Sequence, residues 1–264
     1  MITLMAAQQR AALRGYTEHL EACGRAPGTI RVRTSYIRRA YTDLSPWTST
    51  PAELEHWLAG HSWAPASRRS AVASLRDFHE WAVAAGHRTD DPTVGLGAPP
   101  DRPACPHPMP DDDLSHAMKH ADPSTWWLLR VLATTGLRRA ECAQLHSRDL
   151  DGRWIVVHGK GGRVRRVPVP ADVAAHVRKA HGYVFPGRFG GHITPDAIMR
   201  KVERATGHGP HSLRHRFATR TYAASHDVLA VQQLLGHASL ATTQRYLGLN
   251  DDQLIAAARA SWAA

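Results

Sequence analysis

The chain has 264 residues, 43% hydrophobic and 21% charged, which is long enough for two folded domains with buried cores. Its 33 Lys and Arg residues against 23 Asp and Glu residues favour a polyanionic partner, nucleic acid first and an acidic membrane surface second. Three cysteines without paired spacing argue against a disulfide framework or a cysteine zinc site, and no apolar run is long enough to span a membrane.

The first hundred residues predict four helices, at about 6–22, 29–42, 51–59 and 67–85, separated by Gly and Pro. Thr29 is the expected cap of the second helix. The stretch Thr50-Pro-Ala-Glu53 is a capping box with proline in the first turn, which marks the start of the third. The fourth has apolar residues at the spacing of a core stripe, namely Val72, Leu75, Phe78, Trp81 and Ala82.

Residues 97–110 contain six prolines, and proline at that density favours an extended linker. We therefore expect a helical domain at 1–96, the linker at 97–110 and a larger domain at 111–264. The larger part is also the more basic one, with 21 Lys and Arg against 13 Asp and Glu.

The second domain opens with predicted helices at 111–121 and 126–135, the latter ended by Gly136, and a helical turn at 137–145. Two β-branched runs at 154–158 and 164–169 enclose Gly-Lys160-Gly-Gly and predict a hairpin. Helices follow, and 251–262 has an apolar stripe suited to docking, either on a neighbouring subunit or on its own domain. The expected fold class is mainly α with a small antiparallel β-sheet.

The last fifth of the chain places His211, Arg214, His237 and Tyr246 at helix-compatible spacings. Arginine and histidine can bind and neutralise a phosphate, and a tyrosine oxygen can attack one. This combination points to phosphoryl transfer on a polyanion, for which we expect neither a cofactor nor a metal.

Several short motifs now match one family in order: Thr135-Gly-Leu-Arg138-x-x-Glu141, Gly159-Lys160-Gly161, His211-x-x-Arg214-His215, Leu235-Gly-His237 and Thr242-Thr-x-x-Tyr246. The order resembles the tyrosine recombinases, the phage integrase and Xer group, over nearly the whole chain. The resemblance implies a core-binding (SAM-like) DNA-binding domain, a linker and a catalytic domain. The chain begins at the core-binding helices, so we expect no additional arm-binding domain before them.

Arg138 and Arg214 suit the charge that develops on the non-bridging phosphate oxygens. Glu141, one helical turn after Arg138, can orient the guanidinium groups. The resemblance implies that Tyr246 is the nucleophile and that it forms a 3′-phosphotyrosine intermediate. Arg139 is the alternative to Arg138 as phosphate ligand, although the family uses the arginine directly after Gly-Leu.

The leaving 5′-oxygen needs a proton, and Lys160 is the candidate acid, with a surface turn residue as the alternative. His211 is the candidate acid/base or phosphate donor, and His237 the candidate donor to a non-bridging oxygen. His215 is expected to support them. Further candidate DNA contacts, each with a solvated surface as the alternative, are Arg68, Arg69, Arg76, Arg139, Arg163 and Arg216.

The sequence therefore predicts a cytoplasmic, nucleoid-associated site-specific DNA recombinase. Its expected partners are double-stranded recombination sites, on which it forms a homotetramer, with a monomer or weak oligomer when free and no membrane. The alternative is a relaxing enzyme like the type IB topoisomerases. A DNA-binding protein without catalysis is disfavoured by the intact nucleophile.

Overall fold

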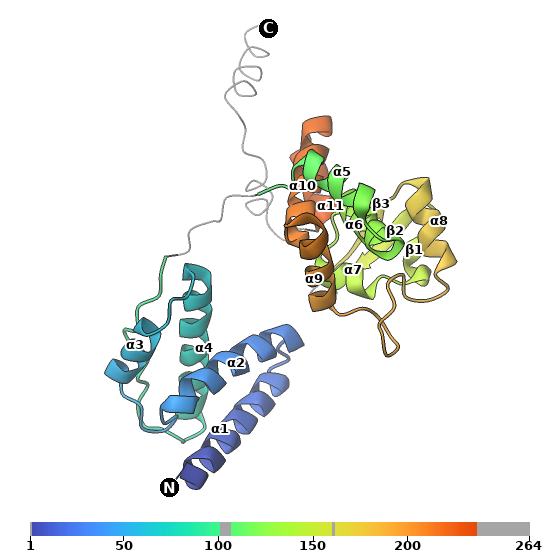
Figure 1. Ribbon diagram of the computed structural model, residues 1–264. Coiled ribbons are helices and arrows are strands. Elements are labelled where there is room, and N and C mark those ends of the chain that lie inside the picture. Colours follow the sequence, from blue (N-terminus) through green and yellow to red (C-terminus); the bar gives the residue numbers. More distant parts are fainter. Residues whose placement is uncertain (1, 101–106, 160–161, 237–264) are drawn as a thin grey trace, which may run out of the picture. The chain divides into compact units, whose positions relative to one another are not determined.

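The computed structural model describes residues 2–100, 107–159 and 162–236 (Figure 1). Its internal contacts divide the chain into two units, Met1–Arg102 and Pro103–Ala264, and the division falls within the proline-rich segment. Each unit has its own hydrophobic core. No helix of the described ranges is both long and apolar enough to cross a membrane.

The described part of the first unit consists of four helices: α1 (Ile2–Ala22), α2 (Pro27–Asp43), α3 (Pro51–Ala59) and α4 (Pro65–Ala84). The predicted capping box is present at α3, where the Thr50 backbone N–H donates to Glu53 Oε2 at 2.8 Å and the Glu53 N–H donates to the Thr50 hydroxyl. The expected Thr29 cap on α2 is wrong. The helix starts at Pro27, whose fixed φ suits the first helical position.

The predicted stripe of α4 forms the centre of the first core, and all five of its residues are buried. Tyr16 of α1 meets Phe78 edge to face, with ring centroids 5.2 Å apart. Tyr41 of α2 lies 5.3 Å from the same ring. The apolar periodicity therefore identified the side of α4 that the neighbouring helices cover.

The second unit combines helices with one small sheet. Its helices are α5 (Asp111–His120), α6 (Pro123–Thr135), α7 (Arg139–Gln144), the 3₁₀ turn η1 (Ser147–Asp149), α8 (Ala171–Lys179), α9 (Pro195–Thr206), α10 (Pro210–Ser225) and α11 (Val228–Leu235). Its strands are β1 (Leu150–Asp151), β2 (Trp154–His158) and β3 (Val164–Pro168), paired antiparallel in the order β1-β2-β3. The expected fold class is confirmed.

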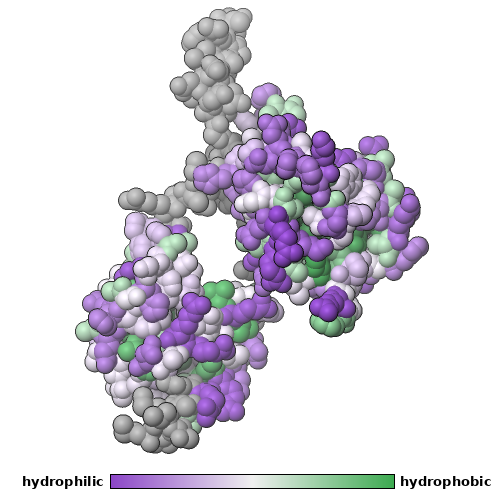
Figure 2. All heavy atoms as spheres, in the orientation of Figure 1, coloured by the Kyte–Doolittle hydropathy of each residue, from purple (hydrophilic) through white to green (hydrophobic). Residues whose placement is uncertain are grey.

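The register pairs His158 with Val164 and Trp154 with Pro168, so the predicted hairpin is present. The buried residues Ile155, Val157 and Val167 on the sheet share one core with α6 and α8. Hydrophilic side chains cover most of the visible surface of this unit (Figure 2). The apolar side of the sheet thus packs on the core. Strand β3 lies next to α7 and α11, which Arg165 contacts.

Gly136 ends α6 in the left-handed conformation, with φ of +61°. A Cβ atom here would lie 2.4 Å from Cδ1 of Phe217, so glycine is needed for both the turn and the close approach of α10. The backbone leaves this turn directly into Leu137 and Arg138, the N-cap residue of α7. The packing of α6 on α10 thereby fixes the position of the Arg138 backbone.

Candidate active site

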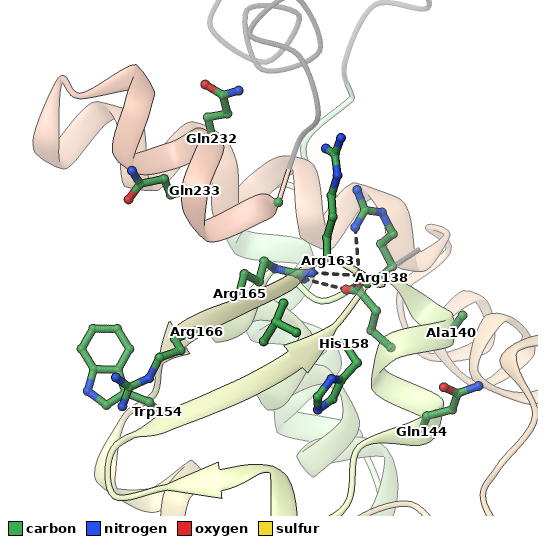
Figure 3. A pocket seen from close by; sticks show the side chains of 14 residues that line it. Arg138, Ala140, Gln144, Trp154, His158, Arg163, Arg165, Arg166, Gln232 and Gln233 are labelled. Atoms are coloured by element: carbon green, nitrogen blue, oxygen red, sulfur yellow. Dashed lines mark hydrogen bonds and ion pairs between the residues drawn. The ribbon is translucent and has the colours of Figure 1, made fainter. Parts of the chain in front are cut away.

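An open groove of about 1510 Å³ lies in the second unit between the β2–β3 hairpin, the start of α7 and the end of α11 (Figure 3). Four arginines line it, which makes it strongly basic: Arg138, Arg163, Arg165 and Arg166. Gln232 and Gln233 of α11 form the opposite side. A groove of this charge suits a phosphate backbone.

Glu141 lies at the centre of the groove's hydrogen bonds, and its side chain is only 8% exposed. Its carboxylate accepts from the backbone N–H of Arg138 at 2.8 Å and from Arg138 Nη1 at 2.8 Å. Arg165 donates to it twice, from Nη1 at 2.9 Å and from Nη2 at 2.6 Å. Dashed lines in Figure 3 mark these bonds from the labelled Arg138 and Arg165. The orientation of Arg138 is therefore set by Glu141, which is itself held by Arg165.

The pKa of Glu141 reflects two opposing effects. Burial acts to raise it, but the hydrogen bonds and charge of Arg165, together with the Arg138 contacts, outweigh burial and lower the pKa to about 2. The carboxylate is consequently ionised at neutral pH. Its negative charge keeps both guanidinium groups in place.

Arg214 of α10 is 1% exposed and is the largest buried polar side chain among the described residues. Its Nη1 donates to the carbonyl of Gly136 at 2.6 Å, and its Nη2 donates to the carbonyl of Leu235 at 2.7 Å. These carbonyls lie at the C-terminal ends of α6 and α11, where the helix dipole favours a cation. Carbonyl partners offset part of the cost of burying the charge and fix the guanidinium plane.

His211 and His215 lie on the first turns of α10 with their rings edge to face and their centroids 4.3 Å apart. Loss of solvation lowers the pKa of His211, and the charges of Arg214 and Arg138 lower it further. Burial lowers the pKa of His215 to about 4, with further lowering by His211, Arg214 and His107. Both rings are therefore neutral at pH 7, and a neutral imidazole can donate from one nitrogen and accept at the other.

The candidate residues Lys160, His237 and Tyr246 lie outside the described residues. Gly159 and Gly236, which directly precede Lys160 and His237 in the chain, both line the groove. The Gly159 N–H donates to the Arg163 carbonyl at 2.7 Å, which closes the described base of the hairpin.

The remaining candidate DNA contacts differ in their surroundings. Arg163 is exposed in the groove. Arg139 is paired instead with Asp196 of α9 at 3.6 Å and is not part of the groove lining. Arg216 donates through Nε to Asp111 at 2.7 Å, and Arg220 also pairs with Asp111. Arg139 and Arg216 thus already have carboxylate partners within the unit.

In the first unit, arginines on the polar face of α4 donate hydrogen bonds to the segment that follows the helix. Arg69 Nη1 donates to the Pro100 carbonyl at 2.8 Å, and Arg76 donates to the Leu96 carbonyl. Arg68 is half-buried on the same helix. Arg69 and Arg76 therefore hold the chain after α4 in place, in addition to any contact with DNA.

Arg165 is a groove residue that the sequence motifs did not indicate. On β3 it is two residues before the buried Val167, and residues two apart on a strand face the same side of the sheet. The Arg165 side chain therefore points toward the interior side. A basic residue at such a position requires buried polar partners, and this alternation is the signal that could have singled it out. Its partner, Glu141, is 24 residues earlier in the chain.

Comparison with known proteins places the chain in a family. The model of the phage integrase family matches residues 109–253, which is more than half of the sequence. This chain belongs to the phage integrase family. A tyrosine recombinase XerC from Chromobacterium violaceum is 31% identical over 273 residues, covering 92% of this chain and 91% of the relative.

The fold of a phage integrase family member is also seen in solved structures. A lambda integrase dimer bound to a COC′ core site aligns with a TM-score of 0.72 and 19% identity, over 90% of this chain and 76% of that one. A lambda integrase tetramer bound to a Holliday junction aligns with a TM-score of 0.69 and 19% identity, over 87% of this chain and 77% of that one. The chain is thus a tyrosine site-specific recombinase, and the topoisomerase alternative is not favoured.

Proposed function

We propose that the groove receives the scissile phosphate of a double-stranded recombination site and that this phage integrase family member exchanges DNA strands through six residues. They are Arg138, Lys160, His211, Arg214, His237 and Tyr246. The observation that supports this most is that two guanidinium groups are oriented by hydrogen bonds within the protein. Arg138 is held by Glu141, and Arg214 is held by two helix-end carbonyls. Donors that are already oriented need no reorganisation when charge develops.

In the proposed reaction the Tyr246 oxygen attacks the phosphorus, and the bond from phosphorus to the 5′-oxygen breaks. The tyrosine proton passes to a base, for which His211 is neutral and available. The leaving 5′-oxygen takes a proton from Lys160. The products are a 3′-phosphotyrosine and a 5′-hydroxyl.

The 5′-hydroxyl of a second strand then attacks the 3′-phosphotyrosine and releases Tyr246. The number of phosphodiester bonds is unchanged, so rejoining needs no nucleotide. Arg138 and Arg214, with a hydrogen bond from His237, would meet the charge on the non-bridging oxygens in both steps. Removal of one such preorganised donor typically slows the chemical step about 10²–10³-fold.

For assembly, we propose that the first unit is the core-binding domain and that both units hold DNA through arginines. Arg163 is the exposed groove arginine, while Arg139 and Arg216 would have to exchange carboxylate partners for phosphates. We further propose a homotetramer on paired sites in the cytoplasm, on nucleoid DNA, with a monomer or weak oligomer when free. The lambda integrase tetramer on a Holliday junction, which has a similar fold, supports the tetramer on DNA.

Covalent capture tests the function and does not require a defined target sequence. The protein is incubated with a pool of duplexes of random sequence, each nicked on one strand. Cleavage releases the short oligonucleotide between the cut and the nick, so the adduct cannot be rejoined. We expect wild-type protein to retain a subset of sequences through denaturing purification.

The Tyr246→Phe variant should bind duplex but retain no DNA covalently, because only the attacking oxygen is lost. Tyr222→Phe is the matched control, since Tyr222 packs against the small α10–α11 cluster and should leave capture intact. Covalent DNA on the Tyr246→Phe protein would exclude Tyr246 as the nucleophile. Absence of adduct on the wild-type protein would overturn the function itself.

A further inference from the structure

Arg165 connects three segments of the second unit, and the proposed strand-transfer mechanism gives it no role. Its side chain is 9% exposed. Two of its hydrogen bonds go to Glu141, and a third runs from Nε to the carbonyl of Leu234 at 2.9 Å. One guanidinium on β3 therefore contacts both the start of α7 and the end of α11.

The end of α11 shows why this third bond matters. The last carbonyls of a helix have no intrahelical donor and must be satisfied in another way. At α11 the Gly236 N–H covers the Gln232 and Gln233 carbonyls, while Leu234 and Leu235 accept from arginines. Arg165 serves Leu234, and Arg214 serves Leu235. Two buried cations thus complete the helix end, where its dipole also favours positive charge.

Gly236 leaves room for this arrangement. It ends α11 with φ of +64°, and a Cβ atom there would lie 2.8 Å from Cδ of Arg165. The aliphatic stem of Arg165 consequently packs directly on the backbone at the point where the chain continues to His237. The backbone exit from α11 and the side chain of Arg165 constrain each other.

We propose that Arg165 is a positioning residue for strand transfer, which holds Arg138 through Glu141 and fixes the exit of α11 relative to it. This proposal rests on the proposed function, because Arg138 matters only if it meets the scissile phosphate. Arg165 acts through its neighbours, since its guanidinium is buried against Glu141 and Leu234. Arg165 follows Lys160 by five residues in the sequence, and the three segments that it connects adjoin Arg138, Lys160 and His237 in the chain.

The test uses substrates that differ in their need for Arg138. In a methylphosphonate linkage one non-bridging oxygen is replaced by a neutral methyl group, so less negative charge develops there during attack. Misplacement of Arg138 should therefore cost less on the diastereomer that lacks the oxygen Arg138 meets. A general loss of folding would slow cleavage of every substrate to the same extent.

The variants are Arg165→Met and Arg165→Lys, with Arg166→Met as the control. Arg166 is the adjacent groove arginine, but it pairs with Asp151 at 2.7 Å and stacks on Trp154, away from Glu141 (Figure 3). Both methionine variants remove one positive charge from the same groove, so they should lower DNA affinity similarly. Lysine keeps the charge but lacks the planar fork that reaches Glu141 twice and Leu234 once.

The substrate is a duplex captured by the wild-type protein, made with the ordinary phosphate and with each methylphosphonate diastereomer. We expect single-turnover cleavage of the phosphate by Arg165→Met and Arg165→Lys to fall about 100-fold at saturating protein. On one diastereomer the deficit should shrink to about tenfold or less. Arg166→Met should show no such difference between substrates.

Equal deficits of both Arg165 variants on all three substrates, or a loss confined to DNA affinity, would overturn the positioning role while the function stands. If Arg165→Met unfolds in a thermal melt, Arg165→Lys alone decides between these outcomes. A wild-type protein that forms no covalent adduct would instead overturn the proposed function, and the inference with it.

Discussion

At the scale of single residues, the site depends on one buried carboxylate between two cations. Glu141 lies at hydrogen-bonding distance from both Arg138 and Arg165, so its removal leaves two guanidinium groups facing each other in the groove wall. Breaking a buried pair is far more costly than the pair's net contribution, because the remaining charges lose their partner. Glu141→Gln should therefore lower both stability and cleavage.

The pH dependence of stability tests this pairing directly. The pKa of Glu141 is about 2 in the folded protein against an ordinary value of 4.5, so its contribution is fully present above pH 4.5. It is lost as the pH falls from 4.5 towards 2, and the shift corresponds to about 3 kcal/mol. Urea unfolding of wild type and Glu141→Gln should differ most near neutral pH and converge in acid. A difference that stays constant over this range would show that Glu141 is not held by the arginines.

The sequence predicted the contact between Arg138 and Glu141 but not the contact between Glu141 and Arg165. The spacing of Arg138 and Glu141 by three residues at a helix start brings them together without any tertiary information. Arg165 is different, because its contact with Glu141 depends on how β3 packs against α7. The alternation along β3 could mark Arg165 as an inward-facing residue, but its partner Glu141 is visible only in the folded chain.

At the scale of elements, local signals placed most of the helices and the hairpin. The capping box at Thr50, prolines in first turns and glycines after last turns each act within a few residues, which is why they can be recognised in a sequence. Strand β1 was not predicted, because two residues are too few to show alternation. It exists through its pairing with β2, which is a tertiary contact.

Glycine at the end of α6 offers a test of how an element positions the site. Gly136→Ala adds a methyl group 2.4 Å from the Phe217 ring, whereas Gly207→Ala at the end of α9 meets nothing within 4 Å. Both positions have positive φ, at +61° and +72°, so both variants carry the backbone strain of about 1–2 kcal/mol.

Only Gly136→Ala should carry a further loss of about 1–3 kcal/mol from overpacking. It should also slow cleavage, because the Gly136 carbonyl holds Arg214 and the next turn holds Arg138. Chemical denaturation and single-turnover cleavage of the two variants measure these effects. Equal destabilisation by the two substitutions would mean that α10 moves away to accept the methyl group.

At the scale of the whole molecule, charge is the property that both units bring to DNA. The net charge is +10, and the larger share lies in residues 111–264. Several arginines have carboxylate or carbonyl partners within their own unit, so the formal charge overstates what is available to phosphates. Composition could therefore predict a polyanionic partner, but only the folded chain separates structural arginines from exposed ones.

Salt dependence measures that available charge. If six phosphates are neutralised, the logarithm of the affinity for duplex DNA should fall with the logarithm of salt concentration with a slope of about −5. Arg163→Gln should make the slope shallower by about one, because Arg163 is exposed in the groove and each lost phosphate contact releases one counterion fewer. Arg130→Gln is the matched control, since Arg130 pairs with Asp172 at 2.9 Å and does not line the groove.

Fluorescence anisotropy with a labelled duplex over a range of salt concentrations gives the three slopes. Arg130→Gln should keep the wild-type slope, because its charge is matched by Asp172 and lies outside the groove. Identical slopes for Arg163→Gln and wild type would place the duplex elsewhere on the protein. A wild-type slope close to zero would mean that phosphate contacts do not drive binding, in which case the basic groove could not be the DNA surface.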